Sequence, residues 1–224
     1  MLFRSVSAAV RREAHVAGQF ISGLLDEQQR QLLQLASLPE FSNDVHDVGA
    51  IRLVMERVRS FHPEFEWLAV TDARGVVLSA TGARLERSDM RHTEWFVQGQ
   101  LGAWVGQPSA AGPLAPYLPP DAQGHPPMLV DVAAPVLDLE GRVQGVLVAR
   151  MNWHRVVEQQ AAISKQDPAL RDALLLGPKG EVWMGPPGAL GGRLTPVGGQ
   201  PVQPGQAPPL VTWPDVGPRL SAAA

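Results

Sequence analysis

The chain has 224 residues, of which 45% are hydrophobic and 18% are charged, and its net charge is −3. These values describe a globular protein with enough apolar side chains for one large domain or two small ones. Scattered Lys and Arg residues argue against a nucleic-acid surface, and the absence of Cys excludes a disulfide scaffold, thiolate metal ligands and a cysteine nucleophile.

The N-terminal segment has the periodicity of a long helix, from about Ser7 to Leu38. Apolar residues recur at three- and four-residue spacing, and no proline interrupts the run. Thirty helical residues span roughly 45 Å, so this helix either braces a whole sheet or forms a stalk. Arg11, Arg12 and Glu13 interrupt the first apolar residues, so we expect neither a signal peptide nor a membrane span here.

A second amphipathic helix is predicted from Val48 to Phe61, ended by His62-Pro63. A β-hairpin follows, with the turn Asp72-Ala73-Arg74-Gly75 between strands 67–71 and 76–80. The same design, a strand, a four-residue turn ending in Gly and a Val-containing strand, recurs in two later hairpins, at 128–151 and near 174–184. Three such hairpins predict an antiparallel sheet with a second, smaller unit.

The hairpin at 128–151 has two unlike faces. Val130, Val132 and Val136 project to one side, whereas Leu129, Asp131 and Ala133 project to the other, because side chains alternate along a strand. A buried Asp needs a hydrogen-bond partner or a wet cavity. We therefore interpret the face of Asp131 as one wall of a pocket.

Three segments have weaker patterns. Residues 81–127 are predicted as an insert loop with a short helix at 95–101, and loops of this kind often carry function. A helix from about 153 to 166 is expected to link the two units. After Gly185 the chain is dense in Pro and Gly, and we expect loop, a frayed edge or an incomplete domain.

An ordered set of motifs carries a family resemblance. The long helix is followed by an Asp-x-x-Gly hairpin, the pair Trp95-Phe96, a strand ending Ala-Ala-Pro, a second Asp-x-x-Gly turn, Gly145-Val146-Leu147 and Trp153. This order resembles the double Cache domain, the extracytoplasmic ligand sensor of bacterial transmembrane receptors. The resemblance covers residues 7 to 160, and residues 170 to 215 as a partial second lobe.

The resemblance implies an α+β fold, with PAS-like antiparallel sheets packed on the long N-terminal helix. It implies a stalk or bracing helix at 1–43, a complete membrane-distal lobe at 44–160 and a partial membrane-proximal lobe at 161–224. The function it implies is small-molecule sensing in a periplasmic part of an inner-membrane receptor, whose output is a histidine kinase, a diguanylate cyclase or a chemotaxis module. The spans and the output would lie outside this chain.

The partners implied are a small polar metabolite (an amine, an amino acid or a carboxylate) and a second copy bound through the N-terminal helix, with no cofactor and no metal. The alternative from another class is a cytosolic PAS-like dimerisation module without a small ligand. We expect no enzyme, because no nucleophile elbow, phosphate-binding loop or His-Glu-x-x-His motif is present and the six His are dispersed.

Asp131 is the first candidate site residue, since an acceptor there suits an amine or hydroxyl ligand. In amino-acid-binding members of the family an Arg lies two residues before the Trp, but here that position is Thr93 and the nearest arginine is Arg91. The remaining alternatives are structural: core packing for the rings, a surface position for Tyr and solvation for Arg. The full candidate set for ligand binding is Asp131, Trp95, Arg91, Tyr117, Phe96, Ser79 and Trp104.

Overall fold

The computed structural model describes residues 2–43, 45, 47–120, 127–157, 175–176, 182–184, 210–213 and 217–220. The chain divides into two compact units, one formed by Leu25–Val156 and the other by residues 1–24 with 157–224. The first unit contains the largest sheet of the described residues and is the part on which a site can be built.

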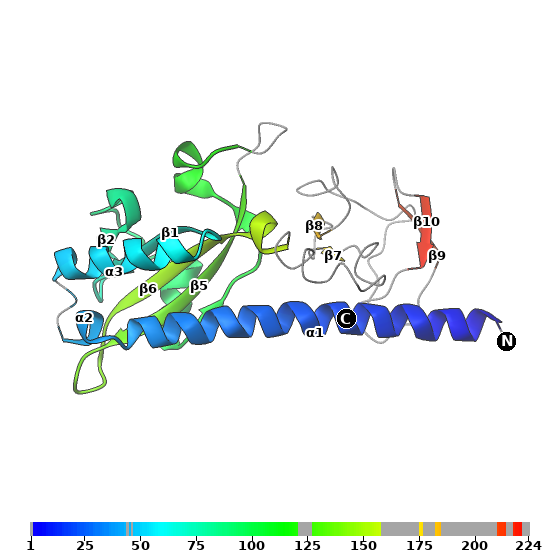
Figure 1. The fold of residues 1–224 in the computed structure, drawn as a ribbon, viewed down its shortest axis with the longest axis horizontal. Helices are drawn as coiled ribbons and strands as arrows, with labels where there is room; N and C mark the ends of the chain where they lie inside the picture. The colour runs from blue at the N-terminus through cyan, green and yellow to red at the C-terminus, as the bar shows by residue number, and fades with distance from the viewer. Residues whose placement is uncertain are drawn as a thin grey trace. The chain divides into compact units, whose positions relative to one another are not determined.

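Three helices precede that sheet (Figure 1). α1, Leu2–Ala36, is continuous over 35 residues, or about 52 Å, and confirms the predicted long helix. α2, Pro39–Ser42, is a single turn. α3, Val48–Phe61, has the predicted bounds; the Asp47 side chain accepts a hydrogen bond from the first turn, which satisfies a backbone amide without a helical partner.

The sheet of the first unit has six strands in the order β2-β1-β6-β5-β3, and β4 also pairs with β5. All of these pairings are antiparallel, so the α+β class with an antiparallel sheet is confirmed. The strands are β1 (Phe65–Thr71), β2 (Val77–Ala80), β3 (Trp104–Val105), β4 (Ser109–Ala110), β5 (Met128–Leu137) and β6 (Val143–Asn152).

Both Asp-x-x-Gly turns are built by the same local interactions. Asp72 and Asp138 each accept hydrogen bonds on Oδ1 from the backbone amides two and four residues later, at 2.8 to 3.0 Å. Gly75 and Gly141 have φ angles of 87° and 80°, which only glycine adopts without strain. The two aspartates therefore have a structural role within their own turns.

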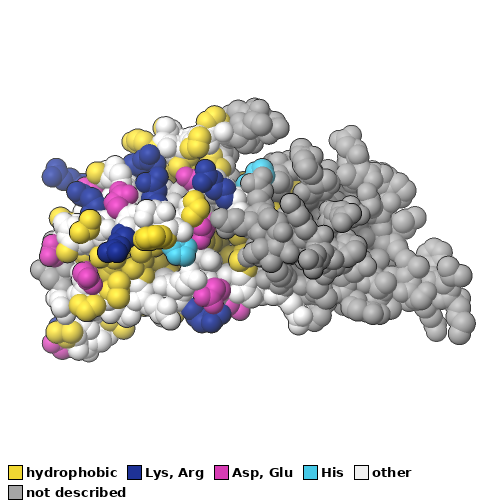
Figure 2. Space-filling view, viewed as in Figure 1, with side chains coloured by type: hydrophobic (Ala, Val, Ile, Leu, Met, Phe, Trp, Pro, Cys, Tyr) yellow, Lys and Arg dark blue, Asp and Glu magenta, His cyan; other side chains and the backbone are white. Residues whose placement is uncertain are grey.

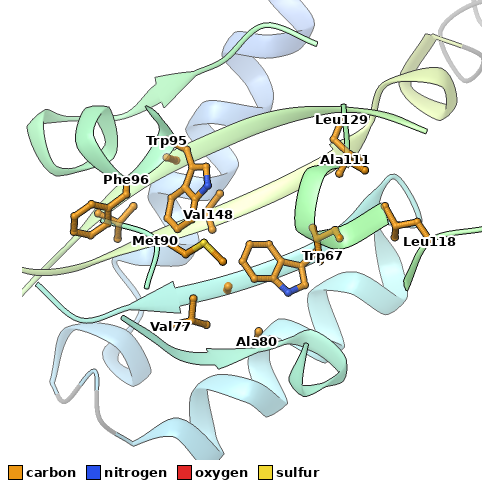
Figure 3. Packing of buried hydrophobic residues seen from close by; sticks show 14 residues of the cluster. Trp67, Val77, Ala80, Met90, Trp95, Phe96, Ala111, Leu118, Leu129 and Val148 are labelled. Carbon is orange, nitrogen blue, oxygen red and sulfur yellow. The ribbon is translucent and has the colours of Figure 1, made fainter. Parts of the chain in front are cut away.

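Different helices cover the two faces of the sheet. α3 packs on β1 and β2 from one side, and α4, Glu94–Leu101, packs on β5 and β6 from the other. Figure 3 shows the buried cluster on the α4 side, to which β1, β5, β6 and α4 all contribute. The apolar face of the 128–151 hairpin, with Val130, Val132 and Val136, is fully buried on the α3 side.

The insert between the first two hairpins has more regular structure than a loop with one helix. It contains the 3-10 helices η1 (Thr81–Ala83) and η2 (Gly112–Tyr117) as well as β3 and β4. β3 and β4 both pair with β5 and so extend the sheet. Two-residue strands are too short to show alternation in sequence, so the sequence did not reveal them.

The second unit contains two described hairpins. β7 (Leu175–Leu176) pairs with β8 (Val182–Met184), where the third hairpin was predicted; its turn lies outside the described residues. β9 (Leu210–Trp213) pairs with β10 (Gly217–Leu220), so of the alternatives expected after Gly185, loop does not apply to these eight residues. The predicted linking helix is observed over 153–157, and the rest of it lies outside the described residues.

In the part of the chain that the structure describes, no helix is long and apolar enough to cross a membrane. On the described surface in Figure 2, Arg side chains lie interspersed with acidic ones. That face carries no continuous basic stripe, in keeping with the scattered charges of the sequence.

Candidate ligand-binding site

Three large side chains form a row across the sheet on the α4 side. Arg150 of β6 is paired with Trp67 of β1 on one side and with Asp131 of β5 on the other. Directly opposed residues of antiparallel strands project to the same face. Leu129 and Ala133, on either side of Asp131, belong to the buried cluster of that face, which confirms the predicted alternation of β5.

Asp131 and Arg150 form a nearly buried ion pair. Arg150 Nε donates to Asp131 Oδ1 at 2.6 Å, and the Arg and Asp side chains retain only 10% and 14% of their exposure. Arg150 Nη1 also donates to the carbonyl oxygen of Ala111 at 2.9 Å. The guanidinium is therefore fixed between the sheet and the residue that precedes η2, and Asp131 has the partner that its burial requires.

Burial raises the pKa of the Asp131 carboxyl above its ordinary value, and this effect exceeds the opposing attraction of Arg150. The carboxylate of Glu94, in the first turn of α4, raises the pKa further by repulsion. The carboxyl group thus takes up a proton more readily than one in water, although it faces a guanidinium.

Aromatic rings pack on the same face of the sheet as this pair; Figure 3 shows Trp67, Trp95 and Phe96 within the buried cluster of that face. Trp95 and Phe96 of α4 are both buried. The Trp95 ring meets Trp67 at a centroid distance of 6.5 Å and an interplanar angle of 70°, and meets Phe96 at 6.2 Å and 88°. These edge-to-face contacts form an apolar layer next to the ion pair, because Trp67 is the sheet neighbour of Arg150.

Trp104 and Tyr117 come from β3 and η2. Trp104 of β3 is paired with Ala133 and packs, half-buried, against the cluster. Tyr117, at the end of η2, is 49% exposed, and the Arg84 guanidinium lies 5.7 Å from its ring centroid. Trp104 is thus a neighbour of the site, and Tyr117 presents a polar tip at the surface.

Ser79 and Arg91 are not brought to the ion pair. The Ser79 hydroxyl donates to the carbonyl oxygen of Val48 in α3, on the opposite face of the sheet. Arg91 is 54% exposed and forms an ion pair with Asp89, two residues away in the same loop. The sheet lies between Ser79 and Asp131, and Arg91 is already paired with Asp89. Neither residue belongs to the candidate site.

Two surface hollows lie elsewhere on the first unit. One, of about 450 Å³, is lined by the end of α3 and the start of β1, with Glu66 and Arg155 among its residues. The other, of about 380 Å³, lies between the end of α1 and α3, with Leu35 and Phe61 among its residues. Asp131 lines neither, so neither hollow is the pocket that the sequence suggested.

Arg150 and Trp67 are site residues that the sequence analysis missed. The available signal was a lone charged residue in the apolar strand Val143–Asn152, opposite a strand with a lone Asp. Among the described residues, no group of His, Asp and Glu could hold a metal ion. The site is therefore an ion pair flanked by aromatic rings, which suits recognition of a small charged molecule.

No protein-family model matches the chain, and no curated protein matches its sequence. Solved structures do match. The ligand-binding domain of Pseudomonas fluorescens chemoreceptor CtaA, in complex with L-serine, has a TM-score of 0.60 at 13% identity, over 85% of this chain and 77% of that one. That of the Pseudomonas aeruginosa PAO1 amino acid chemoreceptor PctC, in complex with GABA, has a TM-score of 0.59 at 18% identity, over 93% and 97%.

The ligand-binding domain of Campylobacter jejuni chemoreceptor Tlp3, in complex with 4-methylisoleucine, has a TM-score of 0.59 at 11% identity, over 82% of this chain and 70% of that one. At such identities the likeness establishes the fold. The chain has the fold of chemoreceptor ligand-binding domains, which confirms the fold that the resemblance found in the sequence implied.

Proposed function

We propose that this chain is the small-molecule-sensing part of a bacterial signal-transduction receptor, located outside the cytoplasm. The observation that carries the proposal is the Asp131–Arg150 pair, nearly buried on the sheet face beside Trp67 and Trp95. A buried ion pair is a weak source of stability, because the desolvation of both charges opposes their attraction. Charged groups kept in such a place are therefore candidates for ligand recognition.

The fold supports the same function. The solved structures that match are ligand-binding domains, two of them in complex with L-serine and GABA. The ligand class that we propose for this chain is a small polar metabolite: an amine, an amino acid or a carboxylate. The alternative function, a cytosolic dimerisation module without a ligand, has no comparable support.

The proposed site consists of Asp131, Arg150, Trp67, Trp95 and Trp104. Phe96 supports Trp95 from within α4, and Tyr117 lies at the rim on η2. The proposal is supported by the buried cluster on the α4 side of the sheet, which Trp67, Trp95 and Phe96 join and against which Trp104 packs. Ligand binding between this face and the segment around η2 would change the contacts that Arg150 makes with Ala111.

The test is a thermal-unfolding screen of the chain against small amines, amino acids and carboxylates. A ligand present at one hundred times its Kd stabilises the folded state by about 2.7 kcal/mol, and the shift in Tm should grow with ligand concentration. Arg150→Met should abolish the shift in Tm. Arg91→Gln, which removes an exposed ion pair with Asp89, should keep it. If no compound of the three classes stabilises the chain, the sensing function is wrong.

The receptor organisation belongs to the same proposal. We assign residues 44–160 to a membrane-distal lobe and 161–224 to part of a membrane-proximal lobe, with the long helix at 1–43 connecting them to an output such as a histidine kinase, a diguanylate cyclase or a chemotaxis module.

A homodimer through α1 is the remaining part of the proposal. Leu33 of α1 is 40% exposed, an apolar side chain available to a second copy. Leu33→Glu should shift sedimentation toward monomer. Leu101→Glu, at an exposed position at the end of α4, is the matched control and should leave the dimer intact. Equal sedimentation of the two variants and the unmodified chain as monomers would contradict dimerisation.

A further inference from the structure

The Asp131–Arg150 pair is chemically asymmetric. An arginine guanidinium keeps its proton in proteins, whereas a carboxylate can take one up. A ligand that binds one partner removes the counter-ion of the other, in a place where the two side chains are only 10% and 14% exposed. An unpaired charge is strongly unfavourable there, so the partner left behind decides which ligand the site accepts.

A cationic ligand at Asp131 would leave Arg150 without its carboxylate. The guanidinium could not lose its charge, and its remaining hydrogen bond would be the one to the neutral carbonyl oxygen of Ala111. An anionic ligand at Arg150 would instead leave Asp131 unpaired, and Asp131 could become neutral by protonation. Burial already raises the pKa of Asp131 in the pair, so this protonation is favoured in advance.

We propose that Arg150 anchors a small carboxylate, which displaces Asp131 from the guanidinium while Asp131 takes up one proton from solvent. The proposal rests on the sensing function above and names its ligand class. The charges balance: the pair is neutral before binding, and the ligand carboxylate with Arg150 is neutral afterwards, beside a neutral Asp131. The site thus binds a carboxylate together with a proton.

The other charged groups around the pair do not replace this proton. Glu94 of α4 is exposed and negative, so it opposes a second anion and favours a neutral Asp131. On β1, Oε1 of Glu66 accepts a hydrogen bond from Asn152 at 2.9 Å. The segment 102–111 contains no titratable side chain, and η2 contains only Tyr117. Asp131 is therefore the group that titrates when its guanidinium is taken.

The test is calorimetric titration with acetate, propionate, pyruvate, L-lactate and succinate, each in two buffers of different ionisation enthalpy. The dependence of the heat on the buffer counts the protons taken up. We expect about one proton per bound ligand at neutral pH, and an affinity that falls about tenfold per pH unit above the native pKa of Asp131.

Three variants locate the effect. Asp131→Asn should bind the same carboxylate without proton uptake and without pH dependence, because an amide is neutral at every pH. Arg150→Met should lose more than about thirtyfold in affinity. Arg150→Lys keeps the positive charge but presents its donors in a different geometry, and it replaces the Met variant if that variant does not fold. Arg91→Gln is the matched control and should bind as the unmodified chain does.

Two results would overturn the proposal: a carboxylate that binds without proton uptake, or a site that takes L-serine or putrescine and none of the five carboxylates. In the second case the sensing function stands and only the ligand class is wrong. If neither these probes nor the compounds of the thermal screen bind, both the ligand class and the sensing function are wrong.

Discussion

A Cβ atom placed on Gly99 of α4 would lie 2.7 Å from Cγ1 of Val146 in β6 and 3.0 Å from Cβ of Ala133. Carbon atoms do not approach so closely, so α4 can lie on the sheet at this point only because residue 99 has no side chain. Gly99, Trp95 and Phe96 belong to the same short helix, so this contact sets how closely Trp95 and Phe96 approach the sheet.

Gly99→Ala should therefore destabilise the folded state by about 1 to 3 kcal/mol, as expected for an overpacked core, and should change the near-ultraviolet signal of the Trp cluster. Gly102→Ala is the matched control: its φ of 164° is open to any residue, and its added Cβ meets nothing within 4 Å. Equal stability of the two variants in urea unfolding would contradict close packing of α4.

Arg150→Met should lower stability in a pH-dependent way. Without the guanidinium the pKa of Asp131 rises further above 3.8, because only burial and Glu94 still act on it. A carboxyl with a raised native pKa contributes most at low pH and loses that contribution as pH rises through the native pKa. We expect a loss of about 1 to 4 kcal/mol near pH 7 that shrinks toward pH 4.

Urea unfolding of the unmodified chain and of Arg150→Met at four pH values between 4 and 7.5 measures this difference. Asp131→Asn serves as the comparison, because it cannot titrate and its difference from the double variant Asp131→Asn/Arg150→Met should not depend on pH. A constant difference between Arg150→Met and the unmodified chain would show that Arg150 does not act through the ionisation of Asp131.

Asp138 should titrate below its ordinary range. Backbone hydrogen bonds from Arg142 and Glu140 and the Arg142 side chain lower its pKa below 3.8. A carboxyl with a depressed native pKa stabilises the fold at pH values above its pKa in the unfolded state. This contribution disappears as the pH falls through the native pKa. The side-chain carboxyl ¹³C shift measures the midpoint, and Arg142→Gln should raise it. A midpoint unchanged by that variant would exclude the side-chain contact as a cause.

Gln144 should hold the C-terminal end of α2 to the start of β6. Its Nε2 donates to the carbonyl oxygens of Phe41 and Ser42 at 3.0 and 3.1 Å. Gln144→Ala leaves these carbonyls without that donor and should destabilise the unit by about 1 to 3 kcal/mol. Gln100→Ala removes one exposed bond to Ala73 and should have a smaller effect. Faster amide exchange at 41–43 in the first variant alone would identify the contact.

Local patterns in the sequence were enough to predict the long helix, α3 and the three Asp-x-x-Gly or Gly-ended hairpins. Each depends on interactions within a few residues: periodic apolar positions, a proline after His62 and glycine at positive φ in the turns at Gly75 and Gly141. Such features act the same way in any fold, so a sequence shows them directly.

Short elements could not be predicted, because their pairing partner creates them. β3 and β4 are two-residue strands that exist through hydrogen bonds to β5. β9 and β10 pair with each other within the Pro- and Gly-rich C-terminal part of the sequence, where no apolar alternation predicts them. The orientation of the Ser79 side chain could not be predicted for the same reason. The β1–β2 pairing contains a bulge, and Ser79 faces α3.

The sequence by itself determined that Asp131 lies on the opposite face of β5 from its valines, because side chains alternate along any strand. Only the tertiary structure decided what Asp131 meets. The pairing of Leu137 with Val143, continued without interruption, would set Asp131 opposite Ala149. The register instead shifts by one residue between Val136 and Leu137 and sets it opposite Arg150. A one-residue shift exchanges the faces of a strand, so this bulge places the guanidinium beside the carboxylate.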